Sequence, residues 1–390
     1  MFRRAALLIV TLGIAGCGEK PEPRSPQPAT KVNASNQIIS TRVEGTAKEL
    51  RIRGEHALLE QKWQEAVDAF EALIAGDPAA ANDPSIIYDL ALAYEGVGER
   101  EKARVRYREI VKRFPNDPNA RSALAREVSL DAYLEDWTAL GEAGETILAR
   151  KDIEPADKML GYGARGLARI TAGDEDGAKK DVNAGQDIVD ETGFGKTGQL
   201  PIAAAMLKYA EGEIKKTKSE KIVLNPPPPD FVMKLEMRCA LLLEAQSNYA
   251  DAIRSVDLHW AAMSGFRVGQ MYRSLHQHLM MIPPTALAKT ESDKQLFYGI
   301  MHVRYRALLD KGIEMMKRTI ALGQKPEMQG VATAWMKRAE SAKAEMEQAL
   351  AEEKAILKTL PYTEETLEKT LLIMKQKMVD DEEKKLKNSK

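Results

Sequence analysis

Hydrophobic and polar residues recur with helical spacing from residue 47 onward, and the helices that this spacing predicts come in pairs. Two 34-residue segments, 47–80 and 84–117, carry the clearest pattern. Each has small residues at positions 8 and 20, an aromatic ring at position 24 and a proline at position 32. Small residues let two helices approach closely, and the ring fills the space beside them. These positions hold Gly54, Ala66, Phe70 and Pro78 in the first segment, and Ala91, Ala103, Tyr107 and Pro115 in the second.

This pattern resembles the tetratricopeptide repeat, a helix–turn–helix unit that stacks on its neighbours. Looser units at 121–154, 159–192 and 233–266 extend the resemblance over 47–266, with a Pro-rich insertion at 211–230. The insertion is either a spacer between repeats or a ligand for a partner's aromatic groove. The resemblance implies an all-α solenoid whose work is to bind proteins.

If the units stack as in that family, the first helix of each unit lines a concave groove. Positions 5, 9 and 12 share one face of that helix, because they are separated by four and three residues. The side chains at these positions mix apolar and charged types, which suits an extended peptide or a partner helix. For any one position, the alternative is an ordinary solvent-facing helix residue. The predicted groove residues are Arg51, Glu55, Leu58, Tyr88, Leu92, Glu95, Met237, Leu241 and Glu244.

The C-terminal region, 267–390, is expected to be helical without the repeat signature. The pattern predicts helices at 264–282, 290–323 and 331–360, and a closing helix from Thr363 to about residue 388. Spacings of four and three indicate a hairpin with short coiled-coil character, packed on the repeats or on another chain. The seam of this hairpin holds Trp335, Ala339, Ala342, Met346, Ala349 and Leu357.

Segments 269–276 and 301–309 of this region are similar to tetratricopeptide lipoproteins of the myxobacterial gliding-motility machinery. That similarity implies an outer-membrane complex that links the cell surface to a periplasmic motor.

The N-terminus has the pattern of a secretion signal. Two arginines precede an apolar stretch, Ala5 to Gly16, that is too short to span a bilayer. The stretch ends in Leu-Gly-Ile-Ala-Gly-Cys, which resembles the bacterial lipobox and implies that residues 1–16 are removed and Cys17 is acylated, for example with palmitate. The alternative is an ordinary signal with a chance cysteine.

The residues after Cys17 predict how the folded body is held. Residues 17–46 are polar and rich in proline, which predicts a disordered tether. Gly18 rather than aspartate follows the cysteine, and by resemblance to enterobacterial sorting this implies the outer membrane. We therefore expect a body that faces the periplasm.

Composition excludes several classes of function. Lys and Arg number 57 against 58 Asp and Glu, so the chain lacks the basic excess that nucleic-acid binding needs. Cys17 and Cys239 are the only cysteines, and acylation of Cys17 would leave none to pair with Cys239. The apolar residues around Cys239 predict a buried thiol.

The sequence shows no spacing that is typical of a catalytic or metal site. Residues 193–198 contain Gly-Lys-Thr, but Asp190 stands where a phosphate-binding loop needs glycine. His276 and His278 are two residues apart, on different sides of a helix, and the other histidines stand alone in sequence.

We therefore expect no catalytic residue, no metal, no cofactor and no nucleic-acid partner. The sequence predicts a lipid-anchored scaffold that binds other envelope proteins in a motility, pilus, secretion or outer-membrane assembly complex. The alternative is an anchored cell-wall enzyme or small-ligand receptor.

Overall fold

The protein is all-α over the residues that the computed structural model describes, which are 44–194, 202–254, 257–284, 288–324 and 333–388. These ranges contain fourteen α-helices, one short 3-10 helix and no β-strand, so the predicted fold class is confirmed. The predicted signal peptide, Cys17 and the tether up to residue 43 lie outside the described residues.

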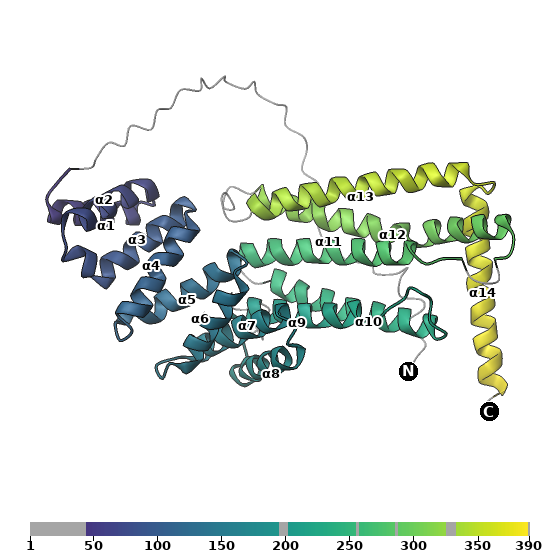
Figure 1. Ribbon diagram of the computed structural model, residues 1–390, viewed down its shortest axis with the longest axis horizontal. Coiled ribbons are helices and arrows are strands. Elements are labelled where there is room, and N and C mark those ends of the chain that lie inside the picture. The colour runs from purple at the N-terminus through teal and green to yellow at the C-terminus, as the bar shows by residue number, and fades with distance from the viewer. Residues whose placement is uncertain (1–43, 195–201, 255–256, 285–287, 325–332, 389–390) are drawn as a thin grey trace, which may run out of the picture.

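The first eight helices form four successive helix pairs, each packed on the next (Figure 1). Local signals in the sequence set the helix ends. The side chains of Asp83 and Asp117 accept hydrogen bonds from backbone N–H groups of the first turn, and a proline follows each of them. The helices are α1 (Ala47–Leu59), α2 (Trp63–Gly76), α3 (Pro84–Val97), α4 (Arg100–Arg113), α5 (Pro118–Tyr133), α6 (Trp137–Ala149), α7 (Pro155–Thr171) and α8 (Glu175–Thr192).

The predicted register of the first two units is confirmed. Ala66 and Phe70 are fully buried, as are Ala103 and Tyr107 at the same positions of the next unit. A Cβ atom on Gly54 would lie 2.7 Å from the ring of Phe70, so this glycine allows the close contact between α1 and α2. The third and fourth units are also helix pairs, and Val182 replaces the ring of the fourth.

The fifth predicted unit, 233–266, is wrong. A repeat needs a turn near its middle, but α10 (Phe231–Ile253) runs through that position without a break. Its 23 residues contain neither glycine nor proline, so nothing ends the helix there. Ala240, which should lie at the helix crossing, is exposed.

The Pro-rich insertion is shorter than predicted. Residues 211–220 belong to the helix α9 (Ile202–Glu220), which packs along α10. Only residues 221–230, including the four prolines, connect these two helices.

Long helices form the C-terminal part, with bounds close to those predicted except that the first of them begins at Leu258 and not at 264. α11 (Leu258–Met280), α12 (Glu291–Gly323) and α13 (Thr333–Thr359) lie side by side, and α14 (Glu364–Asn388) crosses the end of α12 (Figure 1). The predicted seam of α13 packs on α11 and α12 of the same chain, because Trp335 and Met346 are buried there.

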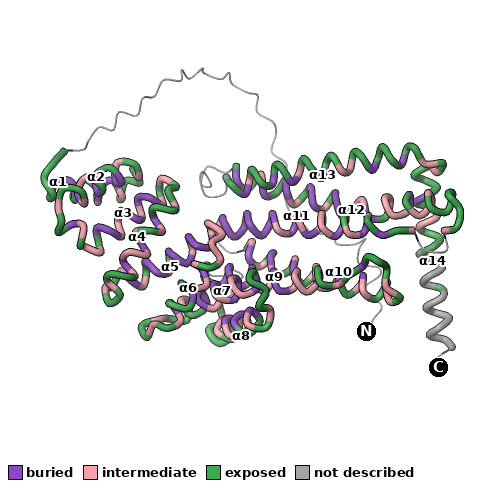
Figure 2. The backbone as a smooth tube through the Cα atoms, in the orientation of Figure 1, coloured by how far each residue is buried: buried purple, intermediate pink, exposed green. Residues whose placement is uncertain are grey.

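One hydrophobic core extends from Leu124 in α5 to Met346 in α13, as the buried faces of the central helices show (Figure 2). The predicted boundary at residue 266 falls inside α11, so the third and fourth units share this core with the C-terminal helices. The first two units have a separate core, from Leu50 to Leu130. Of the helices described, none combines the length and the apolar character needed to cross a bilayer.

Candidate functional site

A cavity of about 610 Å³ opens between the first helices of the first three units. We call it the α1–α3–α5 groove. Four of its lining residues, Glu55, Leu58, Leu92 and Glu95, were predicted from the repeat pattern. The full lining is Glu55, Leu58, Leu59, Trp63, Asp89, Leu92, Glu95, Gly96 and Arg126.

Most of the lining residues that the sequence analysis missed were detectable from helix geometry. Asp89 and Arg126 take position 6 of their units, and Leu59 and Gly96 take position 13. Positions 6, 9 and 13 share a face by the same helical spacing that joins 5, 9 and 12. The prediction therefore used too narrow a stripe of each helix.

Arg51 and Tyr88, the remaining predicted residues of α1 and α3, hold the charged lining residues in place. Arg51 Nε donates to Glu55 Oε1 at 2.8 Å. Arg126 Nη1 donates to both carboxylate oxygens of Glu95, at 3.1 and 3.2 Å, and Arg126 Nε donates to the Tyr88 hydroxyl at 3.3 Å. Two of the three groove carboxylates therefore have a guanidinium partner.

Asp89 is the carboxylate without such a partner. It is half-buried, and its side chain makes no hydrogen bond or ion pair with any other residue in the described ranges. Burial, with the nearby Glu55 carboxylate, raises the pKa of Asp89 to about 6 from its ordinary value of 3.8. Arg51 opposes this effect only in part. The groove thus holds a desolvated negative charge that a cation from a partner could pair with.

The groove also offers apolar surface. Leu59 is 84% exposed at its rim, and Leu58, Leu92 and Trp63 are partly exposed within it. A Cβ atom on Gly96 would overlap the indole of Trp63, at 2.1 Å, so Gly96 keeps room for that ring. Aliphatic surface beside unpaired acid is suited to a segment that is both apolar and basic.

The third predicted set, Met237, Leu241 and Glu244, lies on α10 and does not line the groove. Met237 is 52% exposed, and Glu244 forms an ion pair with Lys215 of α9. The prediction that these residues line the groove is wrong. It depended on a repeat at 233–266, and the continuous helix α10 shows that there is no such repeat.

His302 is not isolated, contrary to its reading in the sequence. His276 Nε2 and His302 Nδ1 lie 2.7 and 3.1 Å from the same oxygen of Glu353, where α11, α12 and α13 meet. Burial opposes ionisation of Glu353, but the hydrogen bonds with both histidines lower its pKa to about 2. The described ranges contain no group of three or more such side chains arranged to hold a metal ion.

The segment 193–198 is described only at its start. Gly193 ends α8 with a positive φ of 68°, which is a common helix end, and residues from 195 onward lie outside the described ranges.

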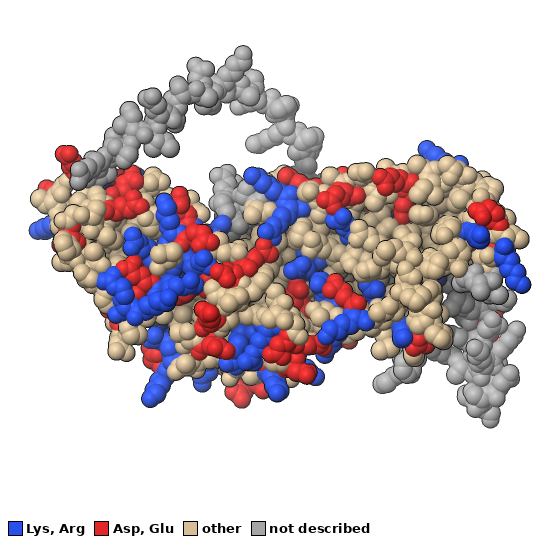
Figure 3. Space-filling view, viewed as in Figure 1, with Lys and Arg blue, Asp and Glu red and all other residues tan. Residues whose placement is uncertain are grey.

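In space-filling view, acidic and basic side chains alternate over the helix pairs, whereas uncharged side chains dominate the visible face over α10 to α12 (Figure 3). Such alternation is typical of solvated helix faces. The unpaired carboxylate of Asp89 is therefore a more specific feature than the general surface charge.

Comparison with known proteins identifies the first helix pairs. Residues 57–127 match the family model described as tetratricopeptide repeat, so the chain contains repeats of this type. The match covers much of the first two predicted units, which includes all of α2, α3 and α4, only the end of α1 and the first part of α5. A tetratricopeptide repeat protein from Parabacteroides merdae has a similar solved structure, with a TM-score of 0.39 and 12% identity over 75% of this chain and 98% of that chain. No curated protein matches the sequence.

Proposed function

We propose that this tetratricopeptide-repeat chain is a lipid-anchored scaffold that binds other envelope proteins through the α1–α3–α5 groove. Tetratricopeptide repeats bind protein partners, and the groove has the size and mixed chemistry of a peptide site. The observation that carries the proposal is Asp89, a half-buried carboxylate that lines the cavity and has no partner within the described part of the chain. Partly buried charges with a shifted pKa gather at functional sites, and this favours a cationic ligand at Asp89.

The partner that fits best is a segment with apolar side chains and one or more lysines or arginines. Its cations would pair with Asp89 and Glu55, and its aliphatic side chains would cover Leu58, Leu59 and Leu92. An amphipathic helix, along the border between its apolar and charged faces, or an extended strand of about five residues or more can bring both kinds of side chain to the groove.

The location of the scaffold follows from the sequence of the N-terminus. A lipid on Cys17 and the tether that follows would hold the repeats in the periplasm. There the repeats would bind partners that belong to a motility, pilus, secretion or outer-membrane assembly complex. The scaffold would connect a membrane-bound component with a soluble one.

The anchor makes a direct prediction. Cys17→Ala should release the protein from membranes or leave it as an unprocessed precursor, because the thiol is the acceptor of the lipid. Membrane fractionation and the mobility of the protein on a gel measure this. A variant that fractionates and migrates like the wild type would contradict the anchor, but it would leave the groove untouched.

Asp89→Asn should stabilise the isolated protein while weakening its binding. Asp89 ionises near pH 6 in the folded protein and near pH 3.8 in the unfolded chain. Its ionisation therefore lowers the free energy of unfolding, and this loss grows between pH 3.8 and pH 6 and stays constant above pH 6. The difference between the two pKa values corresponds to a loss of about 3 kcal/mol at most. Screening by solvent in the open groove reduces this loss to about 1–2 kcal/mol. Urea unfolding at pH 7 and at pH 4 should show the gain only at pH 7.

The matched control is Asp68→Asn, which removes an exposed carboxylate from α2. We expect its stability to stay within about 0.5 kcal/mol of the wild type and its binding to be unchanged. If Asp89→Asn destabilises the protein at pH 7, or binds partners as well as the wild type does, Asp89 is not the binding group.

A further inference from the structure

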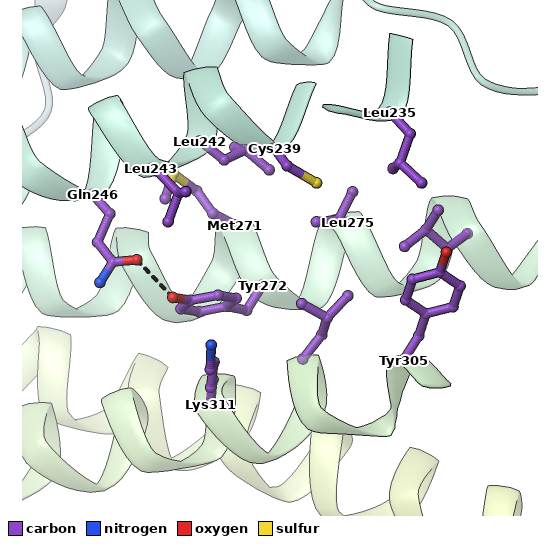
Figure 4. A pocket seen from close by; sticks show the side chains of 12 residues that line it. Leu235, Cys239, Leu242, Leu243, Gln246, Met271, Tyr272, Leu275, Tyr305 and Lys311 are labelled. Atoms are coloured by element: carbon purple, nitrogen blue, oxygen red, sulfur yellow. Dashed lines mark hydrogen bonds between the residues drawn. The ribbon is translucent and has the colours of Figure 1, made fainter. Parts of the chain in front are cut away.

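The α1–α3–α5 groove has room for a segment of polypeptide. Its free volume of about 610 Å³ lies within the range of about 300–1,000 Å³ that is typical of sites for drug-sized ligands, so several side chains fit. A second cavity, between α10, α11 and α12, has a free volume of only about 50 Å³, because side chains of these helices fill it (Figure 4). Cys239, whose thiol the sequence predicts to be buried, is half-buried there. Of these two cavities, only the groove can take a segment of chain.

Carboxylates outnumber guanidinium groups at the groove. Glu55, Asp89 and Glu95 line it together with one arginine, Arg126, which pairs with Glu95. Arg51 pairs with Glu55 at the side of the groove. Asp89 remains without a hydrogen bond or ion pair in the described ranges, so the occupant that fits best brings a cation of its own.

The stretch of chain just before α1 has the complementary composition. Residues 23–43 contain no Asp or Glu but three basic residues, Arg24, Lys31 and Arg42. The last part of this stretch, 37–43, reads Gln-Ile-Ile-Ser-Thr-Arg-Val, and it lies outside the described residues. It combines aliphatic side chains with a cation, which is the chemistry that the groove requires of a partner.

The residue types of 37–43 favour an extended conformation. Four of these seven residues are β-branched, and β-branched side chains disfavour helices and suit extended chain. In an extended chain every second side chain points to the same side, so Ile38 and Arg42 share one face. That face presents an apolar side chain and a cation together.

The reach of the segment matches the length of the groove. Along α1, Glu55 lies nine residues after the N-cap residue Thr46, which is about 14 Å at the helical rise of about 1.5 Å per residue. In the other direction, Arg42 lies four residues before Thr46, and an extended chain of this length spans about 13 Å. A segment that turns back along α1 would therefore bring Arg42 level with Glu55. Ile38 would lie farther along, toward Trp63.

We propose that residues 37–43 of this chain occupy the α1–α3–α5 groove and that a partner displaces them when it binds. This inference rests on the proposed function, because the segment and the partner use the same groove. Arg42 would pair with the Asp89 carboxylate, and Ile38 would cover the apolar lining near Trp63. Docking of the segment lowers the fraction of molecules with an open groove and weakens the apparent affinity for a partner by that fraction.

Arg42→Glu combined with Ile38→Ser should raise the affinity of the full chain for a basic peptide by about fivefold. This is the change expected when the segment occupies the groove in about four of five molecules, because the variant opens the groove in all of them. The peptide is an amphipathic helix of about 18 residues, with leucine on one face and lysine on the other. Fluorescence anisotropy of the labelled peptide measures the affinity.

The matched control is Arg24→Glu combined with Val32→Ser, which makes the same change of charge and a similar apolar loss farther from α1. It should bind the peptide as the wild type does. Peptide binding of equal strength by the wild type and the Arg42 variant would overturn the docking and leave the proposed function standing. An equal gain in both variants would overturn the assignment to residues 37–43.

Docking also couples Arg42 to Asp89. The gain in stability expected for Asp89→Asn applies to an unoccupied groove, and a docked Arg42 would offset part of the cost of the ionised carboxylate. The gain at pH 7 should therefore be larger in the Arg42→Glu background than in the wild type. Urea unfolding of the four proteins measures this difference, and equal gains in the two backgrounds would overturn the pairing.

Photocrosslinking tests the contact directly and needs no partner. Benzoylphenylalanine in place of Ile38 should crosslink to residues of α1 or α3 within one molecule, as mass spectrometry of the digested protein shows. In place of Gln27 it should not reach the groove. Crosslinks from position 38 that miss the groove, or that form only between two molecules, would overturn the proposal. Crosslinks in the groove, with no peptide binding by any variant, would support the docking and contradict the proposed function instead.

Discussion

Arg267→Met should lower the free energy of unfolding by about 3 kcal/mol or more. Arg267 Nε, from α11, lies 2.6 Å from Glu213 Oε1 of α9 and donates to the Tyr209 hydroxyl at 3.1 Å. The Tyr249 hydroxyl of α10 donates to the same glutamate at 2.9 Å. Without Arg267, the buried Glu213 loses its guanidinium partner and keeps the tyrosine hydroxyls and Lys216, whose Nζ lies 3.7 Å away. Urea unfolding followed by circular dichroism measures the loss.

The control for this variant is Arg254→Met, which removes an exposed arginine that pairs with Asp251 on the surface of α10. We expect its unfolding free energy to change by less than about 1 kcal/mol. Equal midpoints for the two variants would mean that the buried network does not hold α9, α10 and α11 together.

Changing the charge of the groove should have the largest effect on binding. Glu55→Lys combined with Asp89→Asn removes both acidic groups that a basic partner would meet, and adds a positive charge. Removal of one member of a buried, hydrogen-bonded charge pair at an interface costs about 2–5 kcal/mol, which is roughly 30-fold or more in affinity. Crosslinking in intact cells, followed by purification of the protein, measures the partners retained.

The matched control is Glu101→Lys combined with Asp68→Asn, which changes the charge by the same amount at exposed positions on α4 and α2. It should retain all partners. If the control loses partners and the groove variant keeps them, binding lies on the outer faces of the second helices.

The sequence predicted the first two helix pairs because their signals are local. Gly54, Ala66 and Phe70 meet within one unit, so their spacing alone determines that they touch. The bounds of α12 to α14 were predicted equally well from prolines and capping residues, which also act locally, whereas α11 begins six residues before its predicted start at 264. Because these interactions are short-range, one sequence was sufficient to predict these helices.

The fifth unit failed because its residues matched the repeat pattern without the turn. Tyr249 and Ala252 are fully buried, as position 17 or 20 of a repeat could require, but they pack between α9 and α10 in another arrangement. Apolar spacing of a helix is the same whether its partner is the next helix or the preceding one. The packing of α9 against α10 determines which helix Tyr249 and Ala252 contact, and this packing joins positions that are distant in the sequence.

The groove was predicted in part. Glu55, Leu58, Leu92 and Glu95 followed from helix spacing within repeats, whereas Asp89 and Arg126 were missed because positions 5, 9 and 12 cover too narrow a stripe of each helix. The contact of His276 and His302 with Glu353 was missed for another reason, since these residues come together only through the packing of α11, α12 and α13.

The central claim is that the groove binds an apolar and basic segment, and a titration with two model peptides tests it most directly. Both peptides are amphipathic helices of about 18 residues with leucine on one face. One carries lysine on the other face and the second carries glutamate. The wild type should bind the lysine peptide about 30-fold more tightly, and the outer-face control should do the same. The variant with Glu55→Lys and Asp89→Asn should lose this preference. A wild type without the preference, or a groove variant that keeps it, would contradict the account.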